Sequence, residues 1–450
     1  MTDIIDELTW RGLIALSTDP DELRKALDTG PVTVYVGFDP TAPGLHIGNL
    51  VQLLTLRRLQ LAGHRPIALV GGATGLIGDP SGKSVERVLN PREVVAGWVD
   101  RIHAEVSRFL DFSAGANGAL VVSNLDWTEP LSALEFLRDI GKHFPVNQML
   151  GRESVKARLE TGGISYTEFS YQVLQANDFL ELYRRHGCTL QVGGSDQWGN
   201  LVSGVDLIRR VDGAAVHALA TPLITKPDGT KYGKTEGGAI WISADLMSPY
   251  AFYQFWVNRA DEEVPGLLRV FTFRSRGEID ELEQQIRERP AARMAQRVLA
   301  AEVTELVHGP AETEKAIAAS HALFGQGDLA AVDEETLAAA IAEIPHRTVR
   351  VPVAELVPVR SAAVSEPDEL VIVVEAGAGL PPVADLMAAT GLVPSKSAAR
   401  RAIAEGGAYL NNRKVTEPDA RPGAADLLHG RFLVLRRGKR TVGGVEVVRG

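Results

Sequence analysis

Residues 32–49 read VTVYVGFDPTAPGLHIGN, which is a short apolar run, a loop rich in Gly and Pro, and the start of a helix expected over 46–62. The run at 32–36 is β-branched and apolar on both faces, as is typical of a strand buried in a parallel sheet. Helical periodicity separates it from comparable runs at 66–70, 119–123 and 189–192. This alternation predicts an α/β protein with a doubly wound parallel sheet, whose ligands bind beyond the carboxyl ends of the strands.

Beyond residue 242 the pattern changes to helices, with helical spacing at 249–258, 278–288, 291–307 and 311–324. An acidic stretch rich in Ala, Val and Pro follows, with one helix expected at 334–342 and two strand-like runs. We therefore divide the chain into an α/β domain (1–245), an α-helical domain (246–326), a connector (327–379) and a small α+β domain (380–450).

Composition and charge restrict the class of protein. The 450 residues are 45% hydrophobic and 23% charged, which predicts two or three soluble domains. The net charge is −10, but residues 380–450 hold 12 Lys and Arg against 6 Asp and Glu. The C-terminal domain is thus at +6 and the rest at −16, which suggests a polyanion such as nucleic acid as its partner, with a merely solvated charged face as the alternative that charge alone leaves open.

Features of targeting and of disulfide scaffolds are missing from the sequence. Cys188 is the single cysteine, so an intramolecular disulfide is excluded. The N-terminal region is acidic and lacks a secretory apolar core, and no apolar run approaches the roughly 20 residues of a membrane helix. We expect a cytoplasmic protein that does not contact a membrane.

Two loops are suited to phosphate. His46 is expected in the first turn of the helix after the first strand, where backbone N–H groups and the helix dipole favour an anion, and Gly48 permits close approach. Residues 226–235 read KPDGTKYGKT and project Lys231 and Lys234 from a turn-rich loop. Paired ammonium groups of this kind suit a polyphosphate whose charge grows during transfer.

Other polar side chains near the same sheet edge are suited to a small amphiphile. Tyr171, Gln175 and Asp178 fall at i, i+4 and i+7 of a helix expected over 166–183, which places them on one stripe. The glycine-rich loop at 71–84 brings one carboxylate, Asp79, to the mouth of the sheet, suited to an ammonium group or a ribose hydroxyl. The segment GGSDQWGN at 193–200 adds Asp196 for a ribose and Gln197 for a polar group.

Together these motifs resemble the bacterial-type tyrosyl-tRNA synthetases, which are class I aminoacyl-tRNA synthetases, over essentially the whole chain. Residues 35–49 resemble the first signature, with its His-Ile-Gly-His core, and KYGKT at 231–235 resembles the Lys-Met-Ser-Lys-Ser loop. Residues 193–200 and the Tyr171 helix are similar to the tyrosyl branch. The resemblance implies a Rossmann-like catalytic domain, an anticodon-side helical domain, and a C-terminal S4-like RNA-binding domain.

The resemblance also implies roles for individual residues. The tyrosine-binding residues would be Tyr35 and Asp178 at the phenol, Asp79, Tyr171 and Gln175 at the ammonium group, and Gln197 near the carboxyl group. Those contacting ATP or the adenylate would be Asp39, His46, Gly48, Gly193, Asp196 and Lys234. The phosphates would be gripped by Thr41, His46, Lys231, Lys234 and Thr235, with Lys83 and Arg87 from a mobile loop. RNA would be bound by Lys396, Arg400, Arg401, Arg413 and Lys414.

The implied reaction activates L-tyrosine with ATP to tyrosyl-adenylate and pyrophosphate, with Mg²⁺ on the pyrophosphate. Tyrosine is then transferred to the 3′ end of tRNA(Tyr). The resemblance implies a homodimer and no tightly bound protein-ligated metal. Five positions depart from the family pattern: Asn49 replaces the second signature histidine, Val36 replaces a polar residue, Tyr232-Gly233 replaces Met-Ser, and Thr235 replaces Ser but keeps the hydroxyl.

Two other functions remain open at this stage. A tryptophanyl-type class I synthetase has the same sheet and signatures, but its indole N–H requires an acceptor alone. A phenol requires both a donor and an acceptor, which Tyr35 and Asp178 supply. A non-catalytic RNA-binding protein would tolerate the loss of His46 or Lys234, and both are present.

Overall fold

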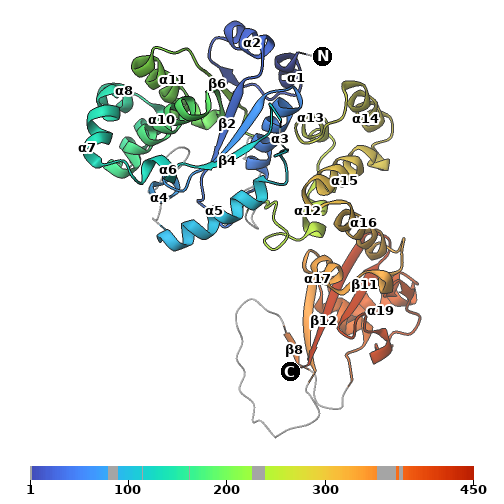
Figure 1. Cartoon of the computed structure of the whole chain (residues 1–450). Helices are drawn as coiled ribbons and strands as arrows, with labels where there is room; N and C mark the ends of the chain where they lie inside the picture. The colour runs from blue at the N-terminus through green and yellow to red at the C-terminus, as the bar shows by residue number, and fades with distance from the viewer. Residues whose placement is uncertain are drawn as a thin grey trace, which may run out of the picture. The chain divides into compact units, whose positions relative to one another are not determined.

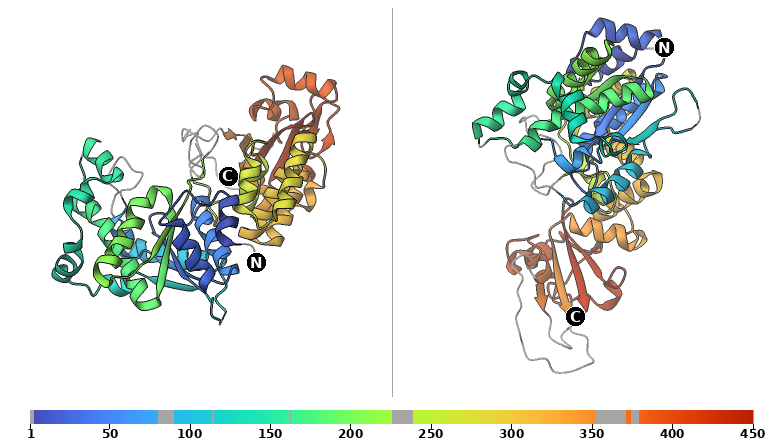
Figure 2. Two further views of the ribbon diagram at one scale, coloured as in Figure 1. Left: turned by 90° about the horizontal axis from the view of Figure 1, so that it is seen from above. Right: turned by 60° about the vertical axis from the view of Figure 1, so that its left-hand side comes forward.

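The computed structural model describes residues 3–79, 90–113, 115–161, 163–225, 239–351, 371–373 and 379–449. The chain forms two compact units (Figures 1 and 2). Unit 1 combines Met1–Leu246 with Arg259–Leu299, and unit 2 combines Met247–Asn258 with Ala300–Gly450. No helix in these described ranges is both long and apolar enough to cross a membrane.

Unit 1 is built on a six-stranded sheet in the order β1-β6-β5-β2-β3-β4. The strands are β1 (Leu16–Ser17), β2 (Thr33–Phe38), β3 (Arg65–Val70), β4 (Leu120–Ser123), β5 (Cys188–Gly194) and β6 (His217–Thr221). All neighbouring pairs from β6 to β4 are parallel, which confirms the predicted doubly wound sheet. The edge strand β1 pairs antiparallel with β6, a departure that the β-α alternation does not predict.

Helices cover both faces of this sheet, which explains why its strands are apolar throughout. They include α3 (Ile47–Leu61), α5 (Arg92–Val106), α10 (Tyr166–His186) and α11 (Trp198–Asp212). Tyr35 and Leu69 of the sheet share one buried cluster with Phe179 of α10. α3 and α5 lie on the opposite side of the sheet from α10 and α11 (Figure 1).

Two buried arginines attach the segment Arg259–Leu299 to the rest of unit 1. Arg58 of α3 donates to the carbonyls of Val270 and Thr272 at 2.8 and 2.7 Å, at the end of α13 (Val264–Phe271). Arg11 donates to the carbonyls of Arg269 and Thr272 at 2.7 and 3.0 Å. The last carbonyls of a helix lack intrahelical partners, so these guanidinium groups cap α13.

Unit 2 joins a group of helices to a second six-stranded sheet. The helices include α12 (Pro249–Val257), α16 (Pro310–Leu323), α17 (Glu334–Ala342), α18 (Val383–Ala389) and α19 (Lys396–Ala404). The sheet has the order β10-β9-β11-β12-β7-β8. Its strands are β7 (His346–Val351), β8 (Val371–Val373), β9 (Ala408–Leu410), β10 (Arg413–Lys414), β11 (Phe432–Arg437) and β12 (Thr441–Arg449).

Part of the expected connector at 327–379 is integral to this sheet. β7 pairs in parallel with β12 and also with β8, and Val349 of β7 is fully buried in the core of the sheet. β7 pairs with the edge of β12, and such a long-range pairing cannot be predicted from the local sequence pattern. The four-part division of the chain stays a prediction, with two strands from the connector range completing the C-terminal sheet.

Candidate active site

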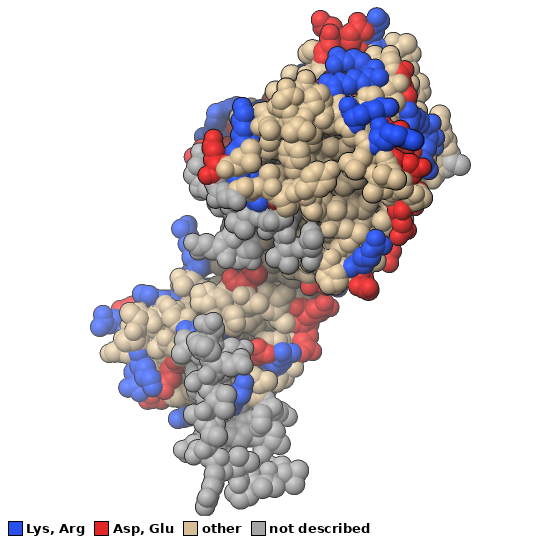
Figure 3. Space-filling view, turned by 90° about the vertical axis from the view of Figure 1, so that its left-hand side faces the viewer, with Lys and Arg blue, Asp and Glu red and all other residues tan. Residues whose placement is uncertain are grey.

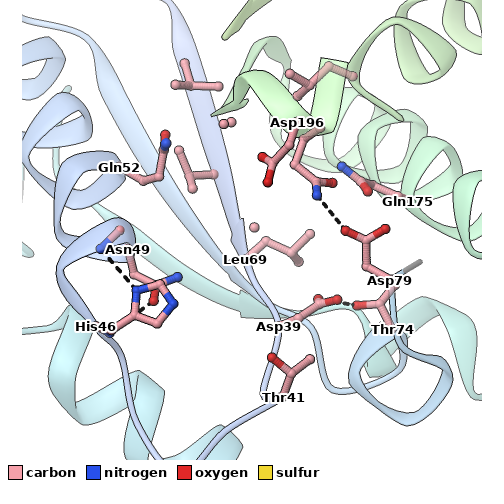
Figure 4. A pocket seen from close by; sticks show the side chains of 18 of the residues that line it. Asp39, Thr41, His46, Asn49, Gln52, Leu69, Thr74, Asp79, Gln175 and Asp196 are labelled. Carbon is pink, nitrogen blue, oxygen red and sulfur yellow. Dashed lines mark hydrogen bonds between the residues drawn. The ribbon is translucent and has the colours of Figure 1, made fainter. Parts of the chain in front are cut away.

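A pocket of about 510 Å³ lies at the carboxyl edge of the unit 1 sheet (Figure 4). It opens between the ends of β2 and β5, where the strand order reverses, and such switch points leave a crevice for ligands. Of the residues predicted to bind tyrosine, ATP or phosphate, twelve lie within the described ranges, and all twelve line the pocket: Tyr35, Asp39, Thr41, His46, Gly48, Asp79, Tyr171, Gln175, Asp178, Gly193, Asp196 and Gln197. Lys83, Arg87, Lys231, Lys234 and Thr235 lie outside the described residues.

Asp178 forms a buried acceptor at one end of the pocket. Its side chain is 2% exposed and accepts hydrogen bonds from Asn124 Nδ2 at 3.0 Å and Trp127 Nε1 at 2.8 Å. Burial raises the pKa of Asp178 to about 7, although these two donors favour the ionised form. The carboxylate is therefore fixed in place, and it titrates near neutral pH.

The hydroxyl of Tyr35 lies in the same end of the pocket and is buried without a hydrogen-bond partner among the described residues. Burial, with a contribution from the Asp178 charge, raises the pKa of Tyr35 well above its usual value, so the hydroxyl stays protonated. A buried hydroxyl without a partner costs about 1–3 kcal/mol. A ligand with a hydroxyl at this point would remove that cost.

A chain of hydrogen bonds joins Tyr171 to the loop after β2. The Tyr171 hydroxyl donates to Asp39 Oδ2 at 2.5 Å, and Thr74 Oγ1 donates to Asp39 Oδ1 at 2.7 Å. Gly71 makes this possible, because a Cβ there would lie 2.0 Å from Asp39 Oδ1. Burial, followed by the Asp39 and Asp79 charges, raises the pKa of Tyr171, so its phenol is a donor at neutral pH.

Asp79 and Gln197 meet across the pocket, as Figure 4 shows from the dashed line to Asp79. Gln197 Nε2 donates to Asp79 Oδ2 at 2.5 Å, and Gln197 Oε1 accepts from Asn200 Nδ2 at 3.0 Å. Asp79 is mostly buried. These bonds orient a carboxylate into a site that Gln175 also lines.

His46 lies one position earlier in the helix than the sequence predicts. It is the N-cap residue of α3 and not part of the first turn, because its Nδ1 accepts the N–H of Gly48 at 3.0 Å. Asn49 Oδ1 accepts the N–H of His46 at 3.1 Å, so the departure from the second signature histidine forms a capping box. With Nδ1 as the acceptor, a neutral His46 ring carries its proton on Nε2.

The sequence of the chain matches two family models. "tRNA synthetases class I (W and Y)" matches residues 27–325, and "Tyrosine--tRNA ligase SYY-like C-terminal domain" matches residues 371–442. The tyrosine–tRNA ligase of Streptomyces coelicolor is 61% identical over 99% of both chains, and that of Mycobacterium bovis is 56% identical over 98% of both. The chain belongs to the tyrosine–tRNA ligase family of class I aminoacyl-tRNA synthetases.

Solved tyrosyl-tRNA synthetases share the architecture of the chain. A C-terminally truncated mitochondrial tyrosyl-tRNA synthetase from Aspergillus nidulans is 30% identical with a TM-score of 0.65, and covers 70% of this chain and 92% of its own. A tryptophanyl-tRNA synthetase from Encephalitozoon cuniculi has a TM-score of 0.51 at 13% identity, which reflects the fold alone. The relatives that match along their whole length favour tyrosine over the tryptophan alternative.

Several residues at the pocket are absent from the sequence prediction: Gln52, Thr74, Gln191 and Trp241 line the pocket, and Asn124 and Trp127 hold Asp178. Asn124 directly follows β4, so the rule that strand ends carry ligands could have found it. Thr74 and Trp127 lie on short helices, α4 (Thr74–Ile77) and α6 (Leu125–Thr128), that carry no periodic signal.

The five predicted RNA-binding cations are all exposed in the C-terminal sheet domain. Lys396, Arg400 and Arg401 lie on α19, and Arg413 and Lys414 form β10. A Cβ at Gly406, just after α19, would lie 2.5 Å from Lys414 Nζ, so β10 places a cation beside the end of that helix. Lys396 and Arg400 each form a surface ion pair, with Asp385 and Asp419 at 2.8 and 2.7 Å.

Proposed function

We propose that the pocket activates L-tyrosine with MgATP, and that Tyr35 and Asp178 select the amino acid. The observation that carries the proposal is the Tyr35 hydroxyl, which has no hydrogen-bond partner in the described part of the chain and lies in the same pocket end as the fixed Asp178 carboxylate. The substrate phenol would accept from Tyr35 and donate to Asp178. Phenylalanine would leave both groups unpaired, which explains selection by a site built for a hydroxyl.

The ammonium group of tyrosine would lie between Asp79, Tyr171 and Gln175. Asp79 contributes the charge, and Tyr171 contributes its hydroxyl oxygen while it donates to Asp39. Gln175 Oε1 is buried without a partner among the described residues, which suits it to accept from an ammonium group. Gln197, turned by its bonds to Asp79 and Asn200, would lie near the substrate carboxyl group.

ATP would occupy the other end of the pocket, against Asp39, Gly48, Gly193 and Asp196. The tyrosine carboxylate attacks the α-phosphorus in line, forming a new P–O bond as the bond to pyrophosphate breaks. Thr41 and His46 would stabilise the charge that grows on the leaving group, together with Lys231, Lys234 and Thr235, and Lys83 and Arg87 would add further phosphate contacts. The ribose hydroxyl at the 3′ end of tRNA(Tyr) then attacks the adenylate carbonyl and releases AMP.

Mg²⁺ would arrive with the nucleotide and be held mainly by phosphate oxygens. The described residues contain no group of three His, Cys, Asp or Glu side chains arranged to hold a metal. Mg²⁺ commonly binds through substrate phosphates with few protein ligands, so the pocket fits MgATP as the substrate.

The deciding experiment is tyrosine-dependent exchange of pyrophosphate into ATP by the purified full chain without tRNA. We expect exchange with tyrosine, and at least about 10³-fold less with phenylalanine at equal concentration, because a missing hydroxyl is rejected strongly by a polar pocket. No exchange, or faster exchange with tryptophan, would contradict the proposal.

The exposed cations of α19 and β10 are proposed to bind tRNA. Deletion of residues 380–450 would remove β11 and β12 and leave β7 paired with β8 alone, so charge substitutions give the sharper test. Changing Lys396, Arg400, Arg401, Arg413 and Lys414 to Ala should reduce tRNA charging by 10-fold or more at about 0.15 M salt and leave pyrophosphate exchange intact. The control is Lys25→Ala, an exposed cation of unit 1, and equal charging by both variants would contradict this role.

A second copy of the chain is the proposed partner of the segment between β4 and α10. Of the large hydrophobic side chains exposed in the described residues, six lie between positions 134 and 166: Leu134, Leu137, Val146, Leu150, Leu159 and Tyr166. Figure 3 looks at the side on which α7 (Ala133–Glu135) and α8 (Val146–Leu150) lie in Figure 1, and a broad face there has few charged side chains. Exposed large hydrophobic side chains concentrated in one segment are typical of an interface.

Light scattering with size-exclusion chromatography tests this homodimer. The wild-type chain should elute at twice the mass of one chain, and Leu134→Glu with Val146→Glu should elute as a monomer. Leu61→Glu, an exposed leucine outside the segment, is the matched control and should stay dimeric. A monomeric wild type would contradict the proposal.

We also propose that the enzyme acts in the cytoplasm, where its tRNA and ATP are found.

A further inference from the structure

Two charged side chains of α5, Arg101 and Glu105, lie against the loop that begins α3. Glu105 is 4% exposed, and its Oε2 accepts the backbone N–H of Leu45 at 2.8 Å. Arg101 Nε donates to the other carboxylate oxygen of Glu105 at 3.2 Å. Glu105 therefore binds the residue directly before His46 with a charge-assisted hydrogen bond.

Arg101 extends this contact to a second segment. Its Nη2 donates to Ser243 Oγ at 2.7 Å and to Asp245 Oδ1 at 2.6 Å. The same segment pairs with the loop, since the N–H of Ile242 donates to the carbonyl of Leu45 at 3.0 Å. Both backbone polar groups of Leu45 are thus held, one by Glu105 and one by the strand-like segment that Arg101 fixes.

The pairing continues at His46 itself. His46 and Trp241 form an antiparallel bridge, and the N–H of Ile47 donates to the carbonyl of Ile240 at 3.0 Å. The rings of His46 and Trp241 lie 6.4 Å apart between centroids. The backbone on both sides of His46 is therefore held by this segment.

Gly44 allows the loop to pass close to this ion pair. A Cβ at position 44 would lie 2.9 Å from Leu246 Cδ1, 3.0 Å from Glu105 Oε1 and 3.4 Å from Arg101 Nε. A side chain at position 44 would therefore require Leu246 or Glu105 to shift. The close approach at Gly44 and the hydrogen bond at Leu45 are independent signs that the loop is held against Glu105.

We propose that Glu105, oriented by Arg101, is a positioning residue that sets where His46 enters the pocket. The inference rests on the proposed function, in which His46 stabilises charge on the leaving phosphates. Neither α5 residue lines the pocket, so their effect passes through the backbone of Leu45. Such an effect can be large, because a displacement of about 1 Å in a catalytic group can cost about 10²-fold in rate.

The test compares variants in tyrosine-dependent pyrophosphate exchange and in equilibrium tyrosine binding. Glu105→Ala should lower kcat by about 10- to 100-fold, while the Kd for tyrosine changes less than about twofold. Glu105→Gln keeps one acceptor oxygen for the N–H of Leu45, so its kcat should fall by only about threefold. Arg101→Met, at a partly exposed site, should lower kcat by about three- to tenfold. This variant provides the test if Glu105→Ala does not fold.

A double substitution with His46→Ala distinguishes a positioning role of Glu105 from a general effect on stability. In a His46→Ala background, the addition of Glu105→Ala should lower kcat by less than about a further twofold. A residue that acts through His46 has nothing left to position once that side chain is removed. The matched control is Glu7→Ala, which breaks another Arg–Glu pair with i,i+4 spacing, at 2.7 Å, and should leave kcat within about twofold of wild type.

The outcomes distinguish the two proposals. If the wild type lacks exchange, or if His46→Ala exchanges as fast as wild type, the proposed function fails. If wild type and His46→Ala behave as expected but the losses from Glu105→Ala and His46→Ala multiply independently, the positioning role alone is wrong. An equal loss of tyrosine affinity and kcat in Glu105→Ala would also overturn it.

Discussion

The Tyr171 hydroxyl donates to Asp39 Oδ2 at 2.5 Å across 132 positions of sequence. Tyr171 belongs to α10 and Asp39 follows β2, so this bond joins the side chains proposed for the amino acid to those proposed for the nucleotide. One change at this point should therefore affect both substrates.

Tyr171→Phe removes this donor and the proposed contact with the ammonium group. We expect kcat/KM for tyrosine in pyrophosphate exchange to fall by about 10- to 100-fold, since a hydrogen bond to a charged group contributes about 1.5–3 kcal/mol. Tyr183→Phe changes a half-buried tyrosine on the same helix, away from the pocket, and should be neutral. Equal effects of the two substitutions would contradict the assignment of Tyr171.

Tyr35→Phe should have opposite effects on stability and on binding. The Tyr35 hydroxyl is buried without a partner among the described residues, so its removal should leave Tm unchanged or raise it. The same change removes the donor to the substrate phenol and should raise KM for tyrosine by about tenfold, or about 1.4 kcal/mol. Thermal unfolding and exchange kinetics on one preparation measure both, and a lowered Tm with unchanged KM would show a purely structural hydroxyl.

Thr41→Val tests stabilisation of the transition state. Thr41 lines the pocket after β2, and its proposed target gains charge only as pyrophosphate leaves. We expect kcat to fall by about 10- to 100-fold with less than a threefold change in KM for ATP. Thr29→Val at the exposed end of α2 (Pro20–Thr29) is the control. A change in KM alone would assign Thr41 to ground-state binding.

Asp178 should make stability depend on pH. Burial raises its folded pKa to about 7 from an ordinary 3.8, so the folded protein binds more protons than the unfolded chain between these values. The stability contributed by the protonated group is fully present below about pH 4 and is lost as the pH rises through about 7. The Tm of Asp178→Asn relative to wild type should therefore rise over this range and level off above it.

Asp212→Asn is the control for this pH dependence. A hydrogen bond from Arg184 lowers the pKa of Asp212, so the stability from this group is present above the ordinary pKa and lost only as the pH falls below it. Its Tm difference from wild type should stay flat between about pH 5 and 8. A flat profile for Asp178→Asn as well would mean that Asp178 keeps an ordinary pKa.

Regular periodicity made elements of both units predictable. The helix expected at 334–342 has the observed bounds of α17, and the strand expected at 66–70 differs from β3 by one residue. The edge strand β1 has two residues and is defined only by its pairing with β6, so no local pattern could predict it. The sequence indicated two strand-like runs in the range assigned to a connector, but it could not show that β7 pairs with β12 and β8 with β7, because the partners of a strand are not set by its local pattern.

In the candidate site too, residues within motifs were predictable and residues defined by long-range contacts were not. Residues carried by a motif, such as His46, Asp178 and Asp196, were predicted and line one pocket. Asn124 and Trp127 belong to no motif, and their importance follows from a distance to Asp178 that spans more than 50 positions. Spacing along a chain cannot encode such contacts, since they depend on which helix packs over which strand end.

By itself the sequence determined the alternation of strands and helices, the positions of the signature loops, and the opposite charges of the body and the C-terminal domain. These properties are local, because hydrophobic periodicity and charge are set by residues near one another in the chain. Only the tertiary structure decided that Tyr171 bonds to Asp39, that Asp178 is buried enough to titrate near neutral pH, and that Glu105 holds the loop before His46. Hydrogen bonding and desolvation act through space, so they exist only once distant segments have packed together.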